Sequence, residues 1–207
     1  MGIVSGSVSY LRFVAGNLPD AFEEMYAEAL QTAAFHEIDP HSDLEVSRGW
    51  VRFDDAFSSE FDPGTLVEPG GNIFLRLRID TLKIPAGTLK AYVDKDARER
   101  AAKAGRDKLV KRELDTVKAD VKKLLRQRSL PRMQLLEMVW NVASGEVRLM
   151  TTSKSAAAHF VDVFEKTFSQ TLRPVGLLTI LWLRGVKDEE IDALGNLEPE
   201  RFHLLRT

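Results

Sequence analysis

The stretch NIFLRLRIDTLKI, residues 72–84, alternates apolar and polar side chains along its length. Four apolar residues fall on one face: Ile73, Leu75, Leu77 and Ile79. The opposite face carries Phe74, Arg76, Arg78 and Asp80. Because successive side chains of a strand point to opposite sides, this pattern predicts a strand with one buried face.

Further strands and helices surround this segment. Leu136 to Val142 and Val147 to Leu149 alternate on either side of Ala143-Ser144-Gly145, which predicts a hairpin. Shorter strands are expected at residues 7–14, around 49–51 and at about 174–183. Helices are expected at about 18–33, at 86–103 and 106–129 before Pro131, and from Ser153 to Phe168. This order favours an α+β fold, with antiparallel sheets, packed helices and a long helical pair in mid-chain.

The chain has 207 residues, enough for one large domain or two small ones. We expect residues 1–84 to form an N-terminal strand–helix–strand part. Residues 85–184 then hold the helical pair and a hairpin–helix–strand part, and residues 185–207 form a tail. No apolar stretch approaches the ~20 residues that span a bilayer, so no membrane segment and a cytoplasmic location are expected. The absence of cysteine excludes thiolate chemistry and disulfides.

Charge is distributed unevenly along the chain. The formal net charge of −2 argues at first against a protein that binds polyanions. Residues 95–132, however, contain 14 basic and six acidic residues, a net charge of +8. The rest of the chain, with 15 basic and 25 acidic residues, carries −10. The average therefore hides a strongly basic segment.

On a helical projection, the second helix of this segment has two faces. Its apolar arc comprises Val110, Leu114, Val117, Val121, Leu124 and Leu125. The opposite arc is cationic and is interrupted by Asp115 alone. A row of cations on a long helix can neutralise several phosphates and release their counterions. The candidate DNA-binding residues are Lys103, Arg106, Lys108, Lys111, Arg112, Lys118, Lys122, Lys123, Arg126, Arg128, Arg76 and Arg78.

A charged arc opposite an apolar one is most often a solvated helix surface. The single sign of this arc favours binding, since solubility faces usually mix Glu with Lys at i,i+4 spacing. For Arg76 and Arg78, an ion-pair role with the acidic remainder of the chain is an equal alternative.

Catalytic motifs are absent from the sequence. It contains no GxSxG, P-loop or GxGxxG pattern. His36 and His41 with Asp39 and Asp43 could be drawn as a metal cluster, but loop-rich acidic segments produce such clusters by chance. We therefore expect no enzyme, no cofactor and no metal, and rank a metal-dependent nuclease as a distant third hypothesis.

The order of several segments resembles the RdgC family of recombination-associated DNA-binding proteins. The resemblance covers about residues 82–184. It comprises Ile84-Pro85, the charged helical pair, Leu130-Pro131-Arg132, the hairpin at Gly145 and the helix start Thr152-Ser153-Lys154-Ser155-Ala156. Weaker similarity extends to Gly49-Trp50-Val51 and to the region from Leu178 to Gly185.

The resemblance implies a bacterial, nucleoid-associated protein that binds duplex DNA with little sequence preference. Family members form a ring-shaped homodimer with a basic inner surface and restrain RecA-driven recombination. They are longer than this sequence, which is expected to represent a short or C-terminally truncated member. Ala157 also stands where the family usually has an acidic residue. The resemblance therefore leaves two questions undecided: whether a closed ring forms, and whether the protein prefers double-stranded or single-stranded DNA.

Two hypotheses follow. The first is a non-catalytic, sequence-nonspecific duplex-DNA-binding homodimer that modulates recombination or nucleoid organisation, with functional interplay with a RecA-type recombinase. The second is a protein–protein interaction module that has lost DNA binding and docks its basic helix on an acidic partner.

Overall fold

The computed structural model describes residues 9–16, 18–176, 179, 181, 185–187, 189–190 and 193. Six strands of these residues form one sheet with the spatial order β2-β3-β4-β5-β1-β6. The strands are β1 (Leu11–Val14), β2 (Val46–Arg52), β3 (Asn72–Thr81), β4 (Arg132–Asn141), β5 (Glu146–Leu149) and β6 (Arg173–Pro174). Every pairing between neighbouring strands is antiparallel. The predicted α+β class is confirmed.

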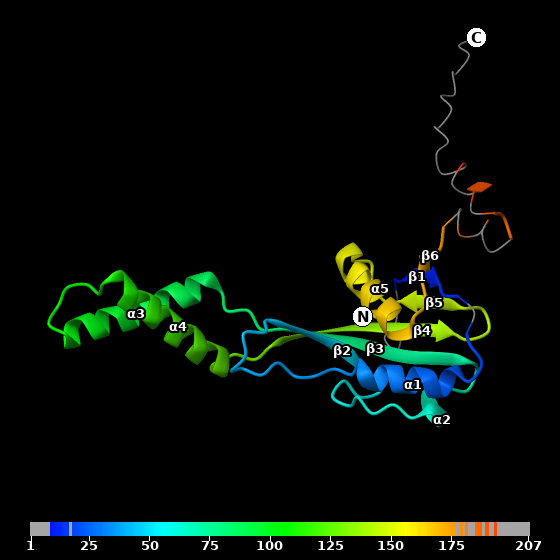
Figure 1. The fold of residues 1–207 in the computed structure, drawn as a ribbon, viewed down its shortest axis with the longest axis horizontal. Coiled ribbons are helices and arrows are strands. Elements are labelled where there is room, and N and C mark those ends of the chain that lie inside the picture. Colours follow the sequence, from blue (N-terminus) through cyan, green and yellow to red (C-terminus); the bar gives the residue numbers. More distant parts are fainter. Residues whose placement is uncertain are drawn as a thin grey trace, which may run out of the picture.

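Helices pack on one face of the sheet and extend from one of its ends. They are α1 (Phe22–Thr32), α2 (Pro63–Leu66), α3 (Ala86–Lys103), α4 (Lys111–Arg128) and α5 (Lys154–Phe168). Helices α1 and α5 lie against the sheet, whereas α3 and α4 project away from it (Figure 1). We call residues 86–128 the helical arm. The described residues contain no helix with both the length and the hydrophobicity needed to cross a bilayer.

Strand β3, the long alternating strand, lies inside the sheet between β2 and β4. Its predicted inward face is confirmed, since Ile73, Leu75, Leu77 and Ile79 are all buried. The same face of β4 continues this core with Leu136, Met138 and Trp140. We call this the inner face of the sheet.

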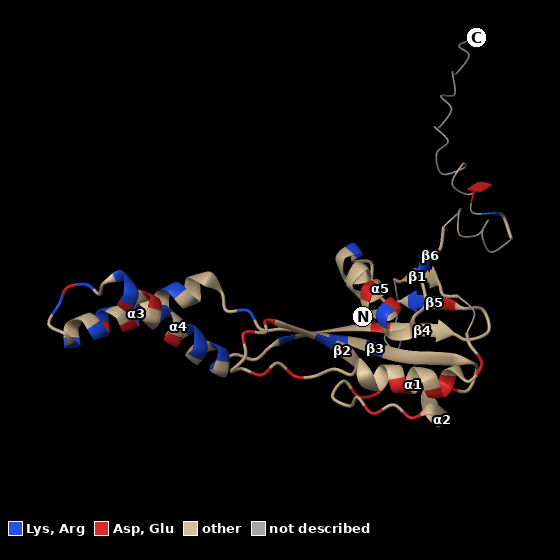
Figure 2. Ribbon diagram, in the orientation of Figure 1, with Lys and Arg blue, Asp and Glu red and all other residues tan. Residues whose placement is uncertain are grey.

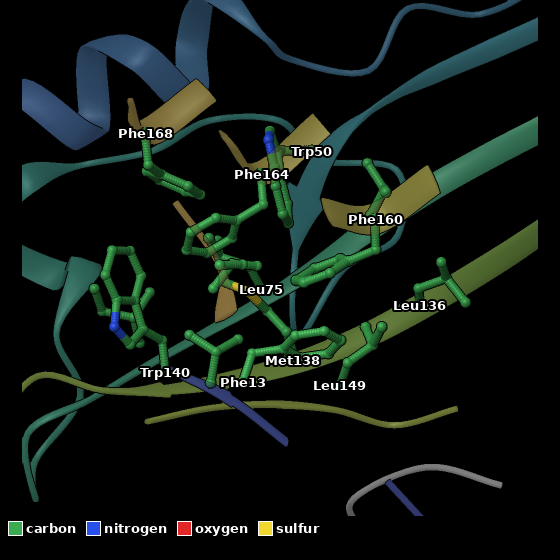
Figure 3. Packing of buried hydrophobic residues seen from close by; sticks show 14 of the residues in the cluster. Phe13, Trp50, Leu75, Leu136, Met138, Trp140, Leu149, Phe160, Phe164 and Phe168 are labelled. Carbon is green, nitrogen blue, oxygen red and sulfur yellow. The ribbon is translucent and has the colours of Figure 1, made fainter. Parts of the chain in front are cut away.

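Aromatic side chains fill the space between the inner face and the helices (Figure 3). Phe160, Phe164 and Phe168 recur at every fourth position of α5 and are nearly or fully buried. Phe160 packs edge-on against Trp50, and Phe164 lies 5.0 Å from Trp140 between ring centroids. Side chains three and four positions apart share one side of a helix, so this spacing places all three rings on the sheet.

Local chemistry sets the ends of these elements. Ser153 accepts a hydrogen bond from the Ala156 amide at 3.3 Å and so begins α5 as predicted. Gly145 has φ +67 in the β4–β5 turn, and a Cβ there would lie 3.0 Å from the Ala15 carbonyl oxygen. Only glycine meets both conditions without strain. The predicted hairpin is thus confirmed, together with its turn.

Three predicted boundaries are wrong. The first helix begins at Phe22 rather than at about 18, because Ala21 immediately before it has a left-handed conformation (φ 57). Helix α4 begins at Lys111 rather than 106, because Gly105 (φ +65) ends α3 in a left-handed turn and the next residues connect the helices. The strand expected at about 174–183 is restricted to β6, and Thr179 and Leu181 are helical. Most of that stretch and of the expected tail lies outside the described residues.

The arm interrupts the sheet between β3 and β4. Residues 1–84 supply β1, β2 and β3, while residues 85–184 supply the arm, β4, β5 and β6. Strands from the two ranges meet at β3–β4 and at β1–β5. The arm is therefore displayed on one continuous sheet.

Candidate nucleic-acid interface

The helical arm is held together by a small core of its own. Val93 of α3 and Val117, Val121 and Leu125 of α4 are buried in a cluster separate from that of the sheet. Arg100 crosses between the helices and forms ion pairs with Asp96 at 2.9 Å and Asp120 at 3.0 Å. These contacts fix the rotation of α4, and with it the direction of its basic side chains.

Most of the predicted cations on the arm are exposed. Figure 2 shows Lys and Arg along both helices of the arm. Seven of them form no ion pair or side-chain hydrogen bond within the part of the chain that the structure describes. They are Lys103, Lys108, Lys111, Arg112, Lys118, Lys123 and Arg128. We call these seven residues the arm cations. Unpaired, solvated cations are available to an anionic ligand without breaking an internal contact.

Two predicted residues on the arm are ion-paired. Arg106 contacts Glu113 at 2.8 Å, and the hydrogen bond from this guanidinium holds the pKa of Glu113 below its ordinary value. Glu113 also accepts the Val110 amide at 3.1 Å, so this pair organises the turn before α4. Lys122 lies 3.5 Å from Glu45, which precedes β2.

Arg126 does not lie on an exposed arc. It is 3% exposed, and its Nη2 donates to the Leu44 carbonyl oxygen at 2.8 Å. Nearby, Gln127 contacts His41 at 3.3 Å. At its base, α4 packs against residues 41–45, which cover a side of the helix that is open further along. The helical projection assigned Arg126 to solvent because it does not include this neighbouring segment.

Arg76 and Arg78 lie on the sheet, away from the arm. Arg78 is 5% exposed and pairs through two nitrogens with Asp80, at 3.0 and 2.7 Å. Its guanidinium also lies over the rings of Phe35 and Phe57. Arg76 pairs with Glu137 at 2.7 Å. The ion-pair alternative therefore describes both residues, and neither extends the surface of the arm.

The apolar arc of α4 is only partly covered. Val117, Val121 and Leu125 are buried, but Val110, Leu114 and Leu124 are 57%, 41% and 40% exposed. The apolar arc identified in the sequence is therefore buried at three of its six positions. A single partner helix covers a narrow stripe, and no third layer of the described residues packs beside it.

Two exposed arginines of the sheet, outside the predicted set, also form no ion pair within the described ranges. Arg48 lies on β2 and Arg132 begins β4. Neither was among the candidate residues, although Arg132 closes the basic segment, because neither lies on the basic helix. The alternation of β2 and β4, once paired with β3, places both on the inner face of the sheet.

Features suited to catalysis or metal binding are scarce. No group of three or more His, Asp or Glu side chains among the described residues is arranged to hold a metal. Asp39, one member of the candidate cluster, accepts the His41 amide at 2.8 Å and so organises its own turn. A hollow of about 420 Å³ lies beside β2 and β3 and is bordered by Arg52, Asp54, Glu60 and three phenylalanines.

Comparison with protein families gives no matching family model, and comparison with curated proteins gives no match.

Proposed function

We propose that this protein is a non-catalytic DNA-binding protein whose helical arm contacts the phosphate backbone of duplex DNA without reading sequence. The observation that carries the proposal is the set of seven exposed arm cations without internal partners. Lys and Arg contacts to phosphate fix position on DNA but carry no sequence information. The resemblance to the RdgC family supports the same function.

The rest of the charge distribution fits this proposal. Acidic residues dominate outside the arm, along α1 and the adjoining loops (Figure 2). A negative surface repels DNA from the body of the protein and directs it to the positive arm. We extend the proposal to a homodimer that modulates recombination or nucleoid organisation beside a RecA-type recombinase.

The salt dependence of duplex binding tests the proposal. If Lys111, Lys118 and Lys123 each neutralise one phosphate, changing all three to Gln lowers the slope of log K against log salt by about 2.7. The matched control changes three body cations to Gln, namely Arg12, Arg148 and Lys166, all of which are ion-paired. The control is expected to keep the wild-type slope. No duplex binding by the wild type at low salt would refute the proposal.

A second candidate function is docking on an acidic protein partner. It is favoured by the exposed Leu114 and Leu124, which add apolar contact area to the basic arm. Titration of a labelled acidic amphipathic peptide and of a labelled duplex separates the two functions. Binding of the peptide without binding of the duplex would favour docking.

A further inference from the structure

Beyond the reach of α1 and α5, the strands β2, β3 and β4 continue toward the arm (Figure 1). Strand register identifies the side chains on the inner face of this extension. The row nearest the arm is Val46, Thr81 and Arg132, and the next row is Arg48, Ile79 and Gln134. The third row, Trp50, Leu77 and Leu136, already belongs to the aromatic core. We call the first two rows the neck face.

On β2 and β4, solvent exposure increases from the third row toward the arm. Trp50 and Leu136 are buried, whereas Arg48 and Gln134, one row away on the same strands, are exposed. Arg132, in the row nearest the arm, is exposed as well. In the second row the central residue, Ile79, is still buried at 7% and belongs to the core. The helical cover therefore ends over this row, and the neck face is open at Arg48, Gln134 and Arg132.

The outer face and the neck face of these strands differ in whether their arginines are ion-paired. On the outer face, Arg78 pairs with Asp80 and Arg76 pairs with Glu137. The neck face contains no acidic residue in either row. Its cations, Arg48 and Arg132, form no ion pair or side-chain hydrogen bond among the residues described. Two exposed arginines without a carboxylate on their own face leave a positive surface that lacks internal neutralisation.

We propose that the neck face is a second phosphate-contact surface, which extends the DNA contact from the arm onto the sheet. Guanidinium groups bind phosphate oxygens through paired hydrogen bonds, a geometry that Lys does not offer. Thr81 and Gln134 provide neutral donors beside them. This inference rests on the proposed DNA-binding function.

The spacing of the two arginines makes them independent contacts. They lie two strands apart and two residues out of step, which places their Cα atoms about 12 Å apart for ordinary strand spacing. A DNA strand advances about 3.4 Å along the axis per phosphate. Arg48 and Arg132 therefore meet different phosphates, and each adds its own term to the salt dependence.

The test compares duplex binding by Arg48→Gln/Arg132→Gln with binding by Arg12→Gln/Arg148→Gln. The control pair lies on the outer face of the sheet, since Arg12 and Arg148 are opposite one another and alternate with the buried Phe13 and Val147. Circular dichroism checks that both variants are folded. The neck variant is expected to lower the salt slope by about 1.8, or about 60-fold in affinity at 0.1 M salt, and the control to change neither.

The outcomes distinguish the two proposals. A neck variant that binds like the wild type, while the Lys111/Lys118/Lys123→Gln variant is weakened, overturns the neck face and leaves the arm intact. Equal losses in the neck variant and the outer-face control also overturn it, because the effect then reflects net charge alone. A wild-type protein that does not bind duplex refutes both proposals.

Discussion

The buried pair Arg78–Asp80 yields the strongest stability prediction. Arg78 and Asp80 are 5% and 2% exposed, and two hydrogen bonds join them. Changing Asp80 to Ala leaves a buried guanidinium whose remaining partners are the Ala56 carbonyl oxygen and two phenylalanine rings. Removing one member of a buried pair costs about 3–5 kcal/mol, because the other charge stays desolvated.

The free energy of unfolding is measured by urea denaturation, supported by thermal melts. For a protein of this size the loss corresponds to a decrease of about 6–20 °C in Tm. Replacing both members, as Arg78→Met with Asp80→Leu, removes the unpaired charge, so we expect this variant to lie within about 2 kcal/mol of the wild type.

Duplex binding by the double variant is expected to keep the wild-type salt slope, since Arg78 is not a phosphate contact. If the free energy of unfolding of the Asp80→Ala variant lay within 1 kcal/mol of the wild-type value, the assignment of a buried, structural ion pair would be refuted.

Three further predictions concern other elements. Gly145→Ala should destabilise the protein by about 1–2 kcal/mol, because the φ angle of Gly145 is positive. Gly87→Ala in α3, where a Cβ meets nothing within 4 Å, should instead stabilise it by about 0.5–1 kcal/mol; urea denaturation measures both free energies of unfolding. Val117→Ala should raise amide hydrogen exchange throughout the arm but not in the sheet, because Val117 belongs to the core of the arm alone; equal acceleration in β3 would contradict this. The hydrogen bond and charge of Arg148, together with Arg12, lower the pKa of Glu146, so the contribution of this carboxylate to stability is present above pH ~4.5 and is lost as the pH falls below this value. Glu146→Gln should therefore reduce the free energy of unfolding at pH 7 by about 1 kcal/mol or less and weaken its decrease at acid pH; an unchanged decrease would count against the ion pair.

The sequence alone predicts the parts of the fold that depend on local periodicity. The alternation of apolar and polar residues locates β3 and the hairpin. The recurrence of phenylalanine at every fourth residue locates the buried face of α5. The end of α3 was also predictable from Gly105. The start of α4 was not, because Arg106 to Val110 resemble a helix in composition while Gly105 turns the chain.

The candidate site shows a similar division. Projection onto a helix finds exposed cations such as Lys111 and Lys118, where no other described segment covers the arm. It fails at Arg126, which a segment distant in sequence covers, and at Leu114, which no described segment buries. It cannot find Arg48 or Arg132, because their shared face depends on strand pairing between β2, β3 and β4. The exposure of these residues depends on contacts between segments far apart in the sequence, and the spacing of residues in a single sequence does not reveal such contacts.

Lysine-reactivity footprinting tests the central claim most directly. The acetylation rate of each lysine is measured by mass spectrometry with and without a saturating short duplex. We predict that Lys111, Lys118 and Lys123 of the arm are protected, while Lys154 and Lys166 of α5 react at the same rate in both samples. Duplex binding with no protection of the arm, or with equal protection of α5, would contradict the account.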